Sequence, residues 1–434
     1  MPPAPPTAYC AIDFGTSNSA IALPDHDDRV ALVEVEPGQR TMPTAVFYTL
    51  ECTRPHEDPK RLYGRAALAA YVEGHDGRLM RSMKSVLGSS LVEQGTDVGG
   101  GRSVRFLDVI SGYLRHLKSL AEAQAGGELT HAVLGRPVYF VDDDPERDAQ
   151  AQAALEKAAR QVGFEEVSFQ YEPIAAALDF EATVDHEQLV LVADIGGGTS
   201  DFSLVRVGPA RRQRVERADD ILANHGVHIA GTDFDRHVEL AAILPLAGYK
   251  ARGPAPAERE VPSKVYFDLA TWHLINTVYT PARVMELRRM RSFYADARLH
   301  ARLMAIVEHR LGHGLMARAE AAKIAVADGR EGDVVAIDLD AIEDGLEATL
   351  AEPQALGAIE ADLERIVQAG VETVRRAGVK PDAVEAVYLT GGSTGLAPLA
   401  TRIAAPFTRA RTVRGDRLAS VAQGLGLHAQ RVFR

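Results

Sequence analysis

Two distant parts of the chain share one pattern of apolar runs and glycine-rich turns. Residues 9–15 are apolar up to an aspartate and a glycine, and a second apolar run follows at 19–23. The pattern returns at 189–198, where an aspartate precedes three glycines, and a second run follows at 202–207. Short apolar runs bounded by glycine predict buried strands. A repeat this far apart indicates two related halves, because solenoid repeats are only about 20–50 residues long.

Three longer segments carry apolar residues at helical spacing. Each places aliphatic or aromatic side chains three and four positions apart, as one buried helix face requires: 106–120, 145–162 and 355–377. Pro145 after Asp144 predicts the start of the second helix, because proline is favoured in the first turn. A further strand is predicted at 385–390. Strands that alternate with helices indicate the α/β fold class.

Two segments differ from the rest in composition, and we predict that they are insertions. Residues 52–104 are rich in glycine, arginine and serine. Residues 249–300 begin with a proline-rich linker and continue into an aromatic and basic stretch that holds the only tryptophan, Trp272. We interpret the arginines at 288, 289 and 291 as a solvated helix face, as most exposed charge runs are.

The composition and charge of the chain argue against a membrane protein, a secreted protein and a nucleic-acid-binding protein. Of 434 residues, 48 are lysine or arginine and 60 are aspartate or glutamate, which gives a formal charge of −12. Cys10 and Cys52 have no metal-binding spacing, and Cys10 within an apolar run is expected in the core. No apolar run approaches the roughly 18 residues of a membrane span, and residues 1–7 lack a signal-peptide pattern. We expect a cytoplasmic protein that binds neither nucleic acid nor membrane.

The glycine-rich turns are the strongest chemical signal. A strand that delivers an aspartate into a turn of glycine, threonine and serine suits a phosphate with Mg²⁺. The carboxylate orients the hydration shell of the ion, and backbone N–H groups reach phosphate oxygens. Residues 13–19 and 194–201 both match, and residues 391–394 form a third such turn. Three turns together predict a nucleotide site.

Other nucleotide and metal motifs fit less well. The chain has no GxxxxGK[ST] sequence, which excludes a P-loop NTPase. Residues 424–429 match GxGxxA, but the rest of a βαβ unit does not follow, so we predict no dinucleotide site there. His309 and His313 lie four positions apart without a carboxylate partner, and we interpret both as surface histidines.

A series of collinear motifs resembles the nucleotide-binding domain of the Hsp70 family, within the actin/hexokinase/Hsp70 ATPase superfamily. Its two phosphate motifs, its adenosine motif, its lobe-joining segments and its adenosine-contacting helix all have counterparts here. In chain order these are residues 11–23, 136–140, 171–177, 192–205, 231–235, 319–323 and 388–399. Within the family the chain is most similar to the YegD-like group, which has an enlarged segment like that at 264–291.

The resemblance implies duplicated actin-like ATPase lobes of the ribonuclease H-like type around a central nucleotide cleft. Each lobe would carry an inserted subdomain. Lobe I would span 8–182, with a core of 8–43 and 105–182 and an insertion at 44–104. Lobe II would span 183–434, with a core of 183–230 and 330–434 and an insertion at 231–329 that includes the enlarged segment 249–300.

The resemblance also implies a site for ATP or ADP with Mg²⁺. Asp13 and Asp194 would act on Mg²⁺ through water, and Thr16 and Thr199 would contact the β- and γ-phosphates. The other implied phosphate-side residues are Gly15, Ser17, Gly196, Gly197 and Gly198. The ribose and adenine would lie among Gly231, Glu320, Lys323, Gly391, Gly392, Ser393 and Asp416.

Catalytic roles follow from the same resemblance. Lys84 would neutralise charge that develops on the γ-phosphate, and Glu172 would position or deprotonate the attacking water. Asp201 would be a further acid, farther from the nucleotide than Lys84 and Glu172. Glu172 precedes Pro173, so we expect it in a non-helical junction. Pro137 would couple the nucleotide state to the geometry of the lobes.

Two departures from the family pattern bear on base binding. Gly395 stands where the family has an arginine that stacks on adenine, and Ala327 stands where it has a serine. We therefore expect adenine to be bound more weakly or in a different arrangement. Few residues follow the last motif, so we expect no peptide-binding domain.

The sequence thus predicts a slow, Mg²⁺-dependent ATPase related to the chaperones, with residues 249–300 as a candidate surface for a client or co-chaperone. Two alternatives stay open on the same fold, since a fold alone does not decide function. One is a small-molecule kinase, in which Glu172 or Asp201 would serve as the base. The other is an actin-like filament protein.

Overall fold

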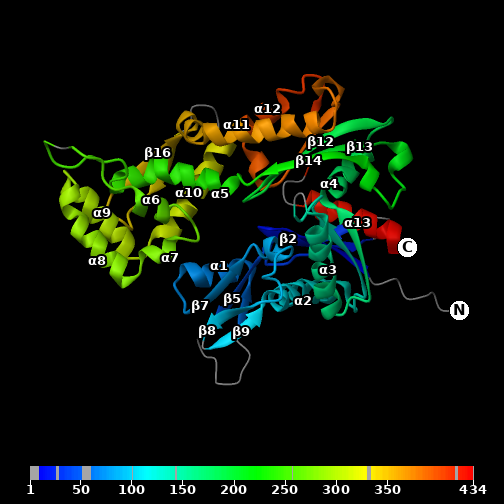
Figure 1. Cartoon of the computed structure of the whole chain (residues 1–434), viewed down its shortest axis with the longest axis horizontal. Coiled ribbons are helices and arrows are strands. Elements are labelled where there is room, and N and C mark those ends of the chain that lie inside the picture. Colours follow the sequence, from blue (N-terminus) through cyan, green and yellow to red (C-terminus); the bar gives the residue numbers. More distant parts are fainter. Residues whose placement is uncertain are drawn as a thin grey trace.

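The computed structural model describes residues 9–25, 29–50, 60–99, 101–141, 144–256, 258–329, 334–415 and 419–433. Figure 1 shows two sheet-containing halves, residues 9–182 and 183–433, one below the other. Helices α4 (Glu172–Glu181) and α13 (Ser420–Phe433) lie between them. Among the described residues, no helix has both the length and the apolar character needed to cross a membrane.

The first half is built on a mixed sheet with the strand order β11–β10–β1–β2–β3, and β4 lies beside β2. The strands are β1 (Tyr9–Phe14), β2 (Asn18–Pro24), β3 (Val30–Leu32), β4 (Met42–Pro43), β10 (His131–Arg136) and β11 (Glu166–Tyr171). β1 and β2 are antiparallel, whereas β10 is parallel to both β1 and β11. The two strands predicted near the N-terminus are confirmed.

The second half has a five-stranded sheet with the order β14–β13–β12–β17–β18. The strands are β12 (Gln188–Ile195), β13 (Ser200–Val207), β14 (Ile221–Val227), β17 (Ala386–Thr390) and β18 (Arg411–Arg414). The central strand β12 is antiparallel to β13 and parallel to β17, just as β1 is antiparallel to β2 and parallel to β10. The two sheets therefore share strand order and strand directions.

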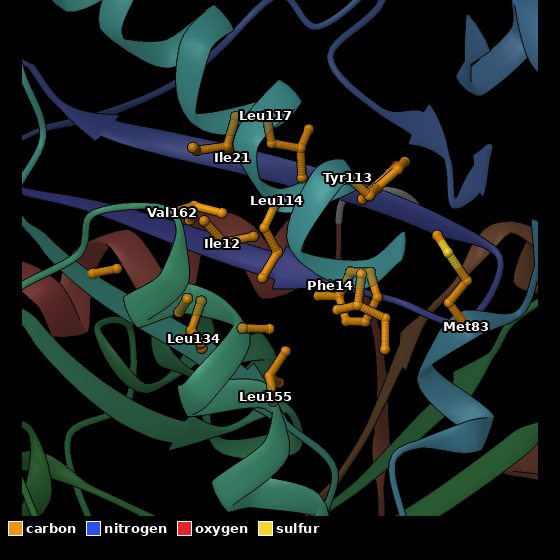
Figure 2. Close-up of a cluster of buried hydrophobic side chains, with 14 of the residues drawn as sticks. Ile12, Phe14, Ile21, Met83, Tyr113, Leu114, Leu117, Leu134, Leu155 and Val162 are labelled. Carbon is orange, nitrogen blue, oxygen red and sulfur yellow. The ribbon is translucent and has the colours of Figure 1, made fainter. Parts of the chain in front are cut away.

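All three segments predicted to be helical are confirmed. They are α2 (Phe106–Ala125), α3 (Pro145–Gln161) and α11 (Glu352–Arg376). The Asp144 carboxylate caps α3 by accepting a hydrogen bond from the Arg147 backbone N–H at 3.1 Å, which satisfies one of the free donors of the first turn. Leu114 and Leu117 of α2 pack in one apolar cluster with Ile12 of β1 (Figure 2). Cys10 is buried in the same cluster, as predicted.

The first half contains a smaller unit between β4 and α2. It has a three-stranded sheet, a helix and a hairpin: β5 (Ala45–Thr49), β6 (Arg61–Tyr63), α1 (Gly64–Val72), β7 (Gly77–Arg81), β8 (Gly95–Gly99) and β9 (Arg102–Arg105). A 3₁₀ turn at Met83–Val86 follows β7 and carries Lys84. Met83 anchors this turn in the apolar cluster of α2 (Figure 2).

The second half contains a larger, mainly helical unit after β14. Its helices are α5 (Gly231–Val238), α6 (Lys264–Leu269), α7 (Ile275–Val278), α8 (Pro281–Arg289), α9 (Ala297–Glu308) and α10 (Gly312–Asp328). The hairpin of β15 (Val334–Asp338) and β16 (Glu347–Ala351) closes the unit before α11. The arginines at 288, 289 and 291 are exposed, which confirms their interpretation as a solvated face.

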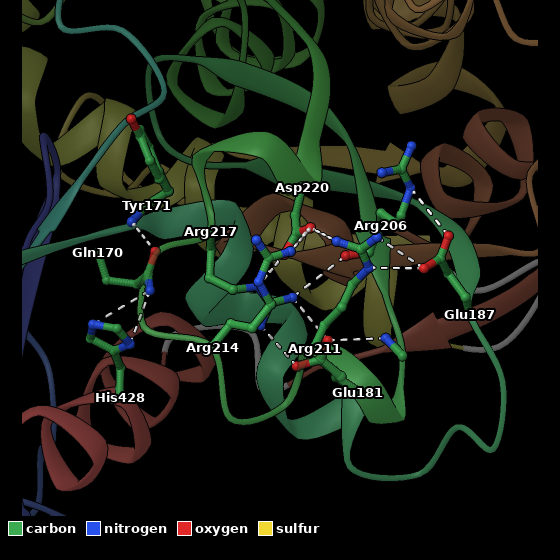
Figure 3. A network of polar contacts seen from close by, with 11 residues as sticks. Gln170, Tyr171, Glu181, Glu187, Arg206, Arg211, Arg214, Arg217, Asp220 and His428 are labelled. Atoms are coloured by element: carbon green, nitrogen blue, oxygen red, sulfur yellow. Dashed lines mark hydrogen bonds and ion pairs between the residues drawn. The ribbon is translucent and has the colours of Figure 1, made fainter.

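Helices α4 and α13 cross at very short range between the two sheets. A Cβ atom added to Gly424 of α13 would lie 1.9 Å from the Ala175 carbonyl oxygen of α4, so the crossing requires glycine. The GxGxxA sequence at 424–429 therefore lies within a helix and serves packing. A buried hydrogen bond of 3.0 Å between Gln170 Nε2 and His428 Nδ1 joins α13 to β11 (Figure 3).

A buried ionic network holds the end of α4 to the β13–β14 connection (Figure 3). Arg217, only 1% exposed, pairs with Glu181 at 2.9 Å and also with Asp220. Arg211 forms a further ion pair with Asp220. Removing one member would leave a buried charge without its partner, which is costly, so these pairs fix the position of α4 on the second sheet.

Gly424→Ala is expected to lower the free energy of unfolding by about 1–3 kcal/mol, because the added Cβ atom forces α4 and α13 apart. The matched control is Gly357→Ala in α11, where an added Cβ atom meets no atom within 4 Å. That change should be neutral or stabilise by up to about 1 kcal/mol. Urea unfolding of both variants measures this, and equal effects would contradict the close crossing.

Candidate nucleotide site

The two glycine-rich turns approach each other where the two halves meet. Asp13 is near the end of β1, and Asp194 is near the end of β12, so each aspartate stands directly before its turn. A Cβ atom added to Gly197 would lie 2.7 Å from Ser17 Oγ of the other half. The absence of a side chain at Gly197 thus allows the two turns to lie side by side.

Four acidic side chains and one lysine gather beside these turns. Lys84 Nζ lies 2.5 Å from Glu172 Oε1, and the lysine side chain is only 9% exposed. Asp13 and Asp194 both interact electrostatically with this pair. Asp201, opposite Asp194 on β13, is hydrogen-bonded to Thr199 and also interacts with the pair. The structure therefore brings five predicted site residues together from both halves.

The pKa values of Asp13, Asp194 and Lys84 reflect their burial and the excess of acidic side chains in this cluster. Withdrawal from water raises the pKa of Asp13 to about 8, and the charge of Glu172 adds to this effect. Withdrawal from water also raises the pKa of Asp194 to about 7, with a further contribution from Asp201. Burial alone would lower the pKa of Lys84, but the carboxylates of Glu172 and Asp13 outweigh it, so that pKa is raised. One ammonium among four carboxylates favours the binding of a cation.

The third glycine-rich turn packs directly on the second. Gly391 has a φ of 88°, and a Cβ atom there would lie 2.5 Å from Asp194 Oδ1. The Ser393 hydroxyl donates a hydrogen bond of 2.8 Å to the Gly196 carbonyl. The Gly231 N–H donates to the same carbonyl at 3.3 Å. The predicted adenosine-side residues Gly231, Gly391, Gly392 and Ser393 therefore adjoin the phosphate-side turn.

Helix α10 places two more predicted residues at this edge. Lys323 Nζ lies 2.6 Å from Asp235 Oδ1 and donates a hydrogen bond of 3.4 Å to the Gly231 carbonyl. Glu320, one turn earlier, is exposed, and its charge acts on Arg81 of the first half. Asp416 lies outside the described residues. The charge of Lys323 is therefore already partnered by Asp235.

The residues present fit a hydrated Mg²⁺ with a phosphate chain. Among the described residues, no three histidine, cysteine or acidic side chains are close enough to hold a metal ion directly. Mg²⁺ usually keeps several waters, so two carboxylates that bind those waters are sufficient. The carboxyl groups of Asp13 and Asp194 lie beside further acids that Lys84 only partly offsets, and the glycine turns next to them offer backbone N–H donors.

Two interpretations of single residues are wrong. Glu172 is the first residue of α4 instead of lying in a non-helical junction, because Pro173 is tolerated in the first turn of a helix. His313 is only 5% exposed and is not a surface histidine. It lies in a contact that the sequence pattern did not reveal.

That contact joins the inserted units of the two halves. The Tyr71 ring of α1 stacks on Trp272 with ring centroids 5.0 Å apart, and His313 of α10 lies 4.9 Å from Tyr71. The Arg81 guanidinium lies 4.1 Å from the centroid of the Trp272 ring, which adds a cation–π interaction. Burial, together with the charge of Arg81, lowers the pKa of His313 to about 4, so this histidine is neutral at pH 7.

A second feature missed from the sequence is Glu239, in a π-helical turn after α5. It is fully buried, and neither carboxyl oxygen has a hydrogen-bond partner within the part of the chain that the structure describes. Burial and the nearby charge of Asp235 raise its pKa well above the ordinary value. A single charged residue within the apolar run at 238–247 is the signal that could have identified it.

Comparisons with known proteins agree with this geometry. Residues 9–241 match the family described as Hsp70 protein, which is more than half of the chain. The chain is also similar to the chaperone protein DnaK of Thermotoga petrophila and that of Thermosipho melanesiensis. Each is 31% identical over 229 residues, a match that takes in 52% of this chain and 34% of the relative. The chain belongs to the Hsp70 family.

The family match covers only part of the candidate site. The family match includes both phosphate-side turns, Lys84 and Glu172, whereas the turn at 391–394 and helix α10 lie beyond it. The matched segment corresponds to about a third of the length of the DnaK relatives. The adenosine-side roles therefore depend on the motifs and on the contacts described above.

Glu239→Gln is expected to stabilise the protein at pH 8 and to have little effect near pH 4. The pKa of Glu239 is raised above 4.5, so the folded chain keeps a proton that the unfolded chain loses as the pH rises. Stability therefore falls as the pH rises above about 4.5, and glutamine removes that loss. We expect a gain of about 1–3 kcal/mol at pH 8 from thermal unfolding. The exposed Glu364→Gln in α11 should show no such pH dependence, and identical behaviour of the two variants would refute the burial argument.

Tyr71→Ala is expected to shift the fluorescence emission of Trp272 to longer wavelengths, because the indole loses its stacking partner and gains contact with water. Trp272 is the only tryptophan, so the signal reports on this contact alone. The control is Tyr139→Ala, which removes an exposed tyrosine of the same half. An unchanged spectrum in Tyr71→Ala would show that the two inserted units do not meet in solution.

Proposed function

We propose that this chain is a Mg²⁺-dependent ATPase that hydrolyses ATP slowly to ADP and phosphate and closes its two halves around the nucleotide. The observation that carries the proposal is the cluster of Lys84 and Glu172 with Asp13, Asp194 and Asp201 at the junction of the halves. A ligand that binds this cluster contacts both halves at once. Membership of the Hsp70 family supports ATP as that ligand.

In this proposal the γ-phosphate lies between the two facing turns. The hydroxyls of Thr16 and Thr199 and the N–H groups of the glycines at 196–198 donate hydrogen bonds to phosphate oxygens. Without nucleotide the Thr199 hydroxyl donates its one proton to Asp201, and in this proposal it turns that donor to a phosphate oxygen when the nucleotide binds. The ribose and base extend toward Lys323 and the turn that contains Ser393.

Lys84 and Glu172 have different roles in the proposed hydrolysis. The Lys84 ammonium stabilises negative charge on the transferred phosphoryl group. Glu172, held in place by its ion pair with Lys84, orients the attacking water and accepts its proton. The water oxygen bonds to the γ-phosphorus as the bond to the β,γ-bridging oxygen breaks and ADP leaves with the electron pair. A bound Mg²⁺ would neutralise charge on the β- and γ-phosphate oxygens.

The same arrangement provides a nucleotide-dependent switch. We propose that the matching sheets are the cores of duplicated actin-like lobes, and that α4 and α13 form the hinge at Gly424 and Ala175. The γ-phosphate would favour the closed state because it contacts both turns, and its release would favour opening. Pro137, which follows β10, lies where sheet and hinge meet and would transmit the change.

The proposal favours hydrolysis over the two alternatives on this fold. Membership of the Hsp70 family, with relatives named as chaperones, supports hydrolysis over transfer of the phosphoryl group to a metabolite. ATP consumption that depends on an added metabolite would indicate a kinase. Sedimentation of the protein with ATP would indicate a filament.

We also propose that a client or co-chaperone protein binds residues 249–300. This segment has exposed apolar side chains as well as exposed arginines, and the apolar ones are Phe267, Met285 and Phe293. Trp272 faces the first half and is excluded from this surface while the inserted units are in contact. Two of the relatives are named as chaperones, which supports a protein partner.

Lys84→Ala and Thr199→Ala are each expected to lower the rate of ATP hydrolysis about 10²–10³-fold, because each removes a group that stabilises the transition-state charge. Lys157→Ala is the control, since Lys157 is an exposed lysine that forms a surface ion pair with Glu93. Single-turnover hydrolysis with Mg-ATP measures all three. The proposal fails if the wild type neither binds nor hydrolyses Mg-ATP, or if both site variants retain its rate.

A further inference from the structure

Two carbonyl groups of the first phosphate-side turn are bound by a single residue, Thr44. Its hydroxyl donates a hydrogen bond of 2.7 Å to the Gly15 carbonyl. Its backbone N–H donates one of 2.9 Å to the Ser17 carbonyl. Thr44 is only 2% exposed and lies between β4 and β5, where the chain enters the inserted unit of the first half. The root of that unit is thus joined directly to the turn.

Buried hydroxyl groups hold Thr44 in this orientation. Each hydroxyl has one proton to donate, and Thr44 gives its proton to the Gly15 carbonyl. Ser19 Oγ is therefore the donor in the hydrogen bond of 2.8 Å that joins it to Thr44 Oγ1. The Tyr113 hydroxyl donates a hydrogen bond of 3.0 Å to the carbonyl of Pro43, the residue before Thr44. The side chain and the backbone at Thr44 are both fixed.

The second phosphate-side turn is held in the same way by Thr232. The Gly197 carbonyl accepts two hydrogen bonds of 2.8 Å, one from the Thr232 hydroxyl and one from its backbone N–H. Thr232 is the second residue of α5, at the start of the helical unit of the second half. Each half therefore uses a threonine at the root of its inserted unit to bind its own turn.

The direction of each carbonyl sets the direction of the next N–H group. In a planar trans peptide, the C=O of one residue and the N–H of the following residue point in opposite directions. The Gly15 carbonyl points at a buried hydroxyl, so the Thr16 N–H points away from the interior of the first half. The Gly197 carbonyl points at Thr232, so the Gly198 N–H points away from the start of α5. The two threonines thus determine the side on which these donors lie.

We propose that Thr44 and Thr232 are positioning residues of the ATPase, which hold the N–H donors of Thr16 and Gly198 in the direction of the bound phosphates. This inference rests on the proposed function. Neither threonine needs to touch the nucleotide, because each acts through the turn that it binds. Donors that are already oriented stabilise charge on the phosphate oxygens without a reorganisation of the turn during the reaction.

The test removes the two hydroxyl groups and then restores them. Thr44→Val and Thr232→Val keep the branched shape and the backbone N–H but lose the hydroxyl, whereas Thr44→Ser and Thr232→Ser keep the hydroxyl. Thr373→Val is the matched control, because Thr373 is a buried threonine of α11 whose hydroxyl donates to the Ala369 carbonyl at 2.8 Å. Single-turnover hydrolysis is measured at saturating Mg-ATP, and thermal unfolding checks each fold.

Thr44→Val is expected to lower the single-turnover rate at least about tenfold, because a misdirected donor stabilises the transition state less well. For Thr232→Val we expect a loss of about threefold or more, since the Thr232 N–H still holds the Gly197 carbonyl. Both serine variants and Thr373→Val should stay within about twofold of the wild type.

Three results would overturn the inference: wild-type rates in the folded valine variants, a loss that serine does not recover, or an equal loss in Thr373→Val. Thr232 is exposed, so its valine variant decides the matter even if Thr44→Val does not fold. A wild type that does not hydrolyse Mg-ATP would instead refute the proposed function.

Discussion

The partly buried ion pair of Lys84 and Glu172 is the interaction on which the proposed site depends. Lys84 comes from a short turn in the inserted unit of the first half, and Glu172 starts the helix that leads into the second half. The pair lies among Asp13, Asp194 and Asp201, so the surrounding carboxylates are only partly neutralised. Desolvated carboxylates in excess favour the binding of a cation such as Mg²⁺. Under the proposed function, binding at this cluster would favour closure of the halves, because the cluster draws side chains from both.

The fold supports this cluster through close backbone packing. Gly197 allows the two phosphate-side turns to meet, Gly391 allows the third turn to pack on Asp194, and Gly424 allows α4 and α13 to cross. The network of Arg217, Glu181 and Asp220 then fixes the far end of α4 on the second sheet. Both ends of α4 are thus held by ion pairs, so a change at Glu172 can be transmitted to the second half.

Local patterns predicted much of the fold correctly. The paired strands and the long helices depend on short-range apolar spacing, which can be read directly from the sequence. The resemblance to the Hsp70 family supplied the members of the charge cluster, and the structure brings them together. Their roles in binding and hydrolysis remain proposals.

The features that were missed depend on contacts between distant segments. The stacking of Tyr71, Trp272 and His313 joins two insertions, and no periodicity in either one indicates the other. Glu239 is buried by neighbouring helices, although its residue type predicts exposure. The helical start of α4 at Glu172 depends on Pro173 occupying the first turn, which a rule for the residue before proline does not capture.

The most direct measurement is a crystal structure of the protein with Mg²⁺ and a non-hydrolysable ATP analogue. The account predicts a triphosphate between the turns that contain Ser17 and Gly197, with Lys84 Nζ within hydrogen-bond distance of a γ-phosphate oxygen. A nucleotide bound elsewhere, or a triphosphate that contacts only one half and leaves Lys84 distant, would contradict it.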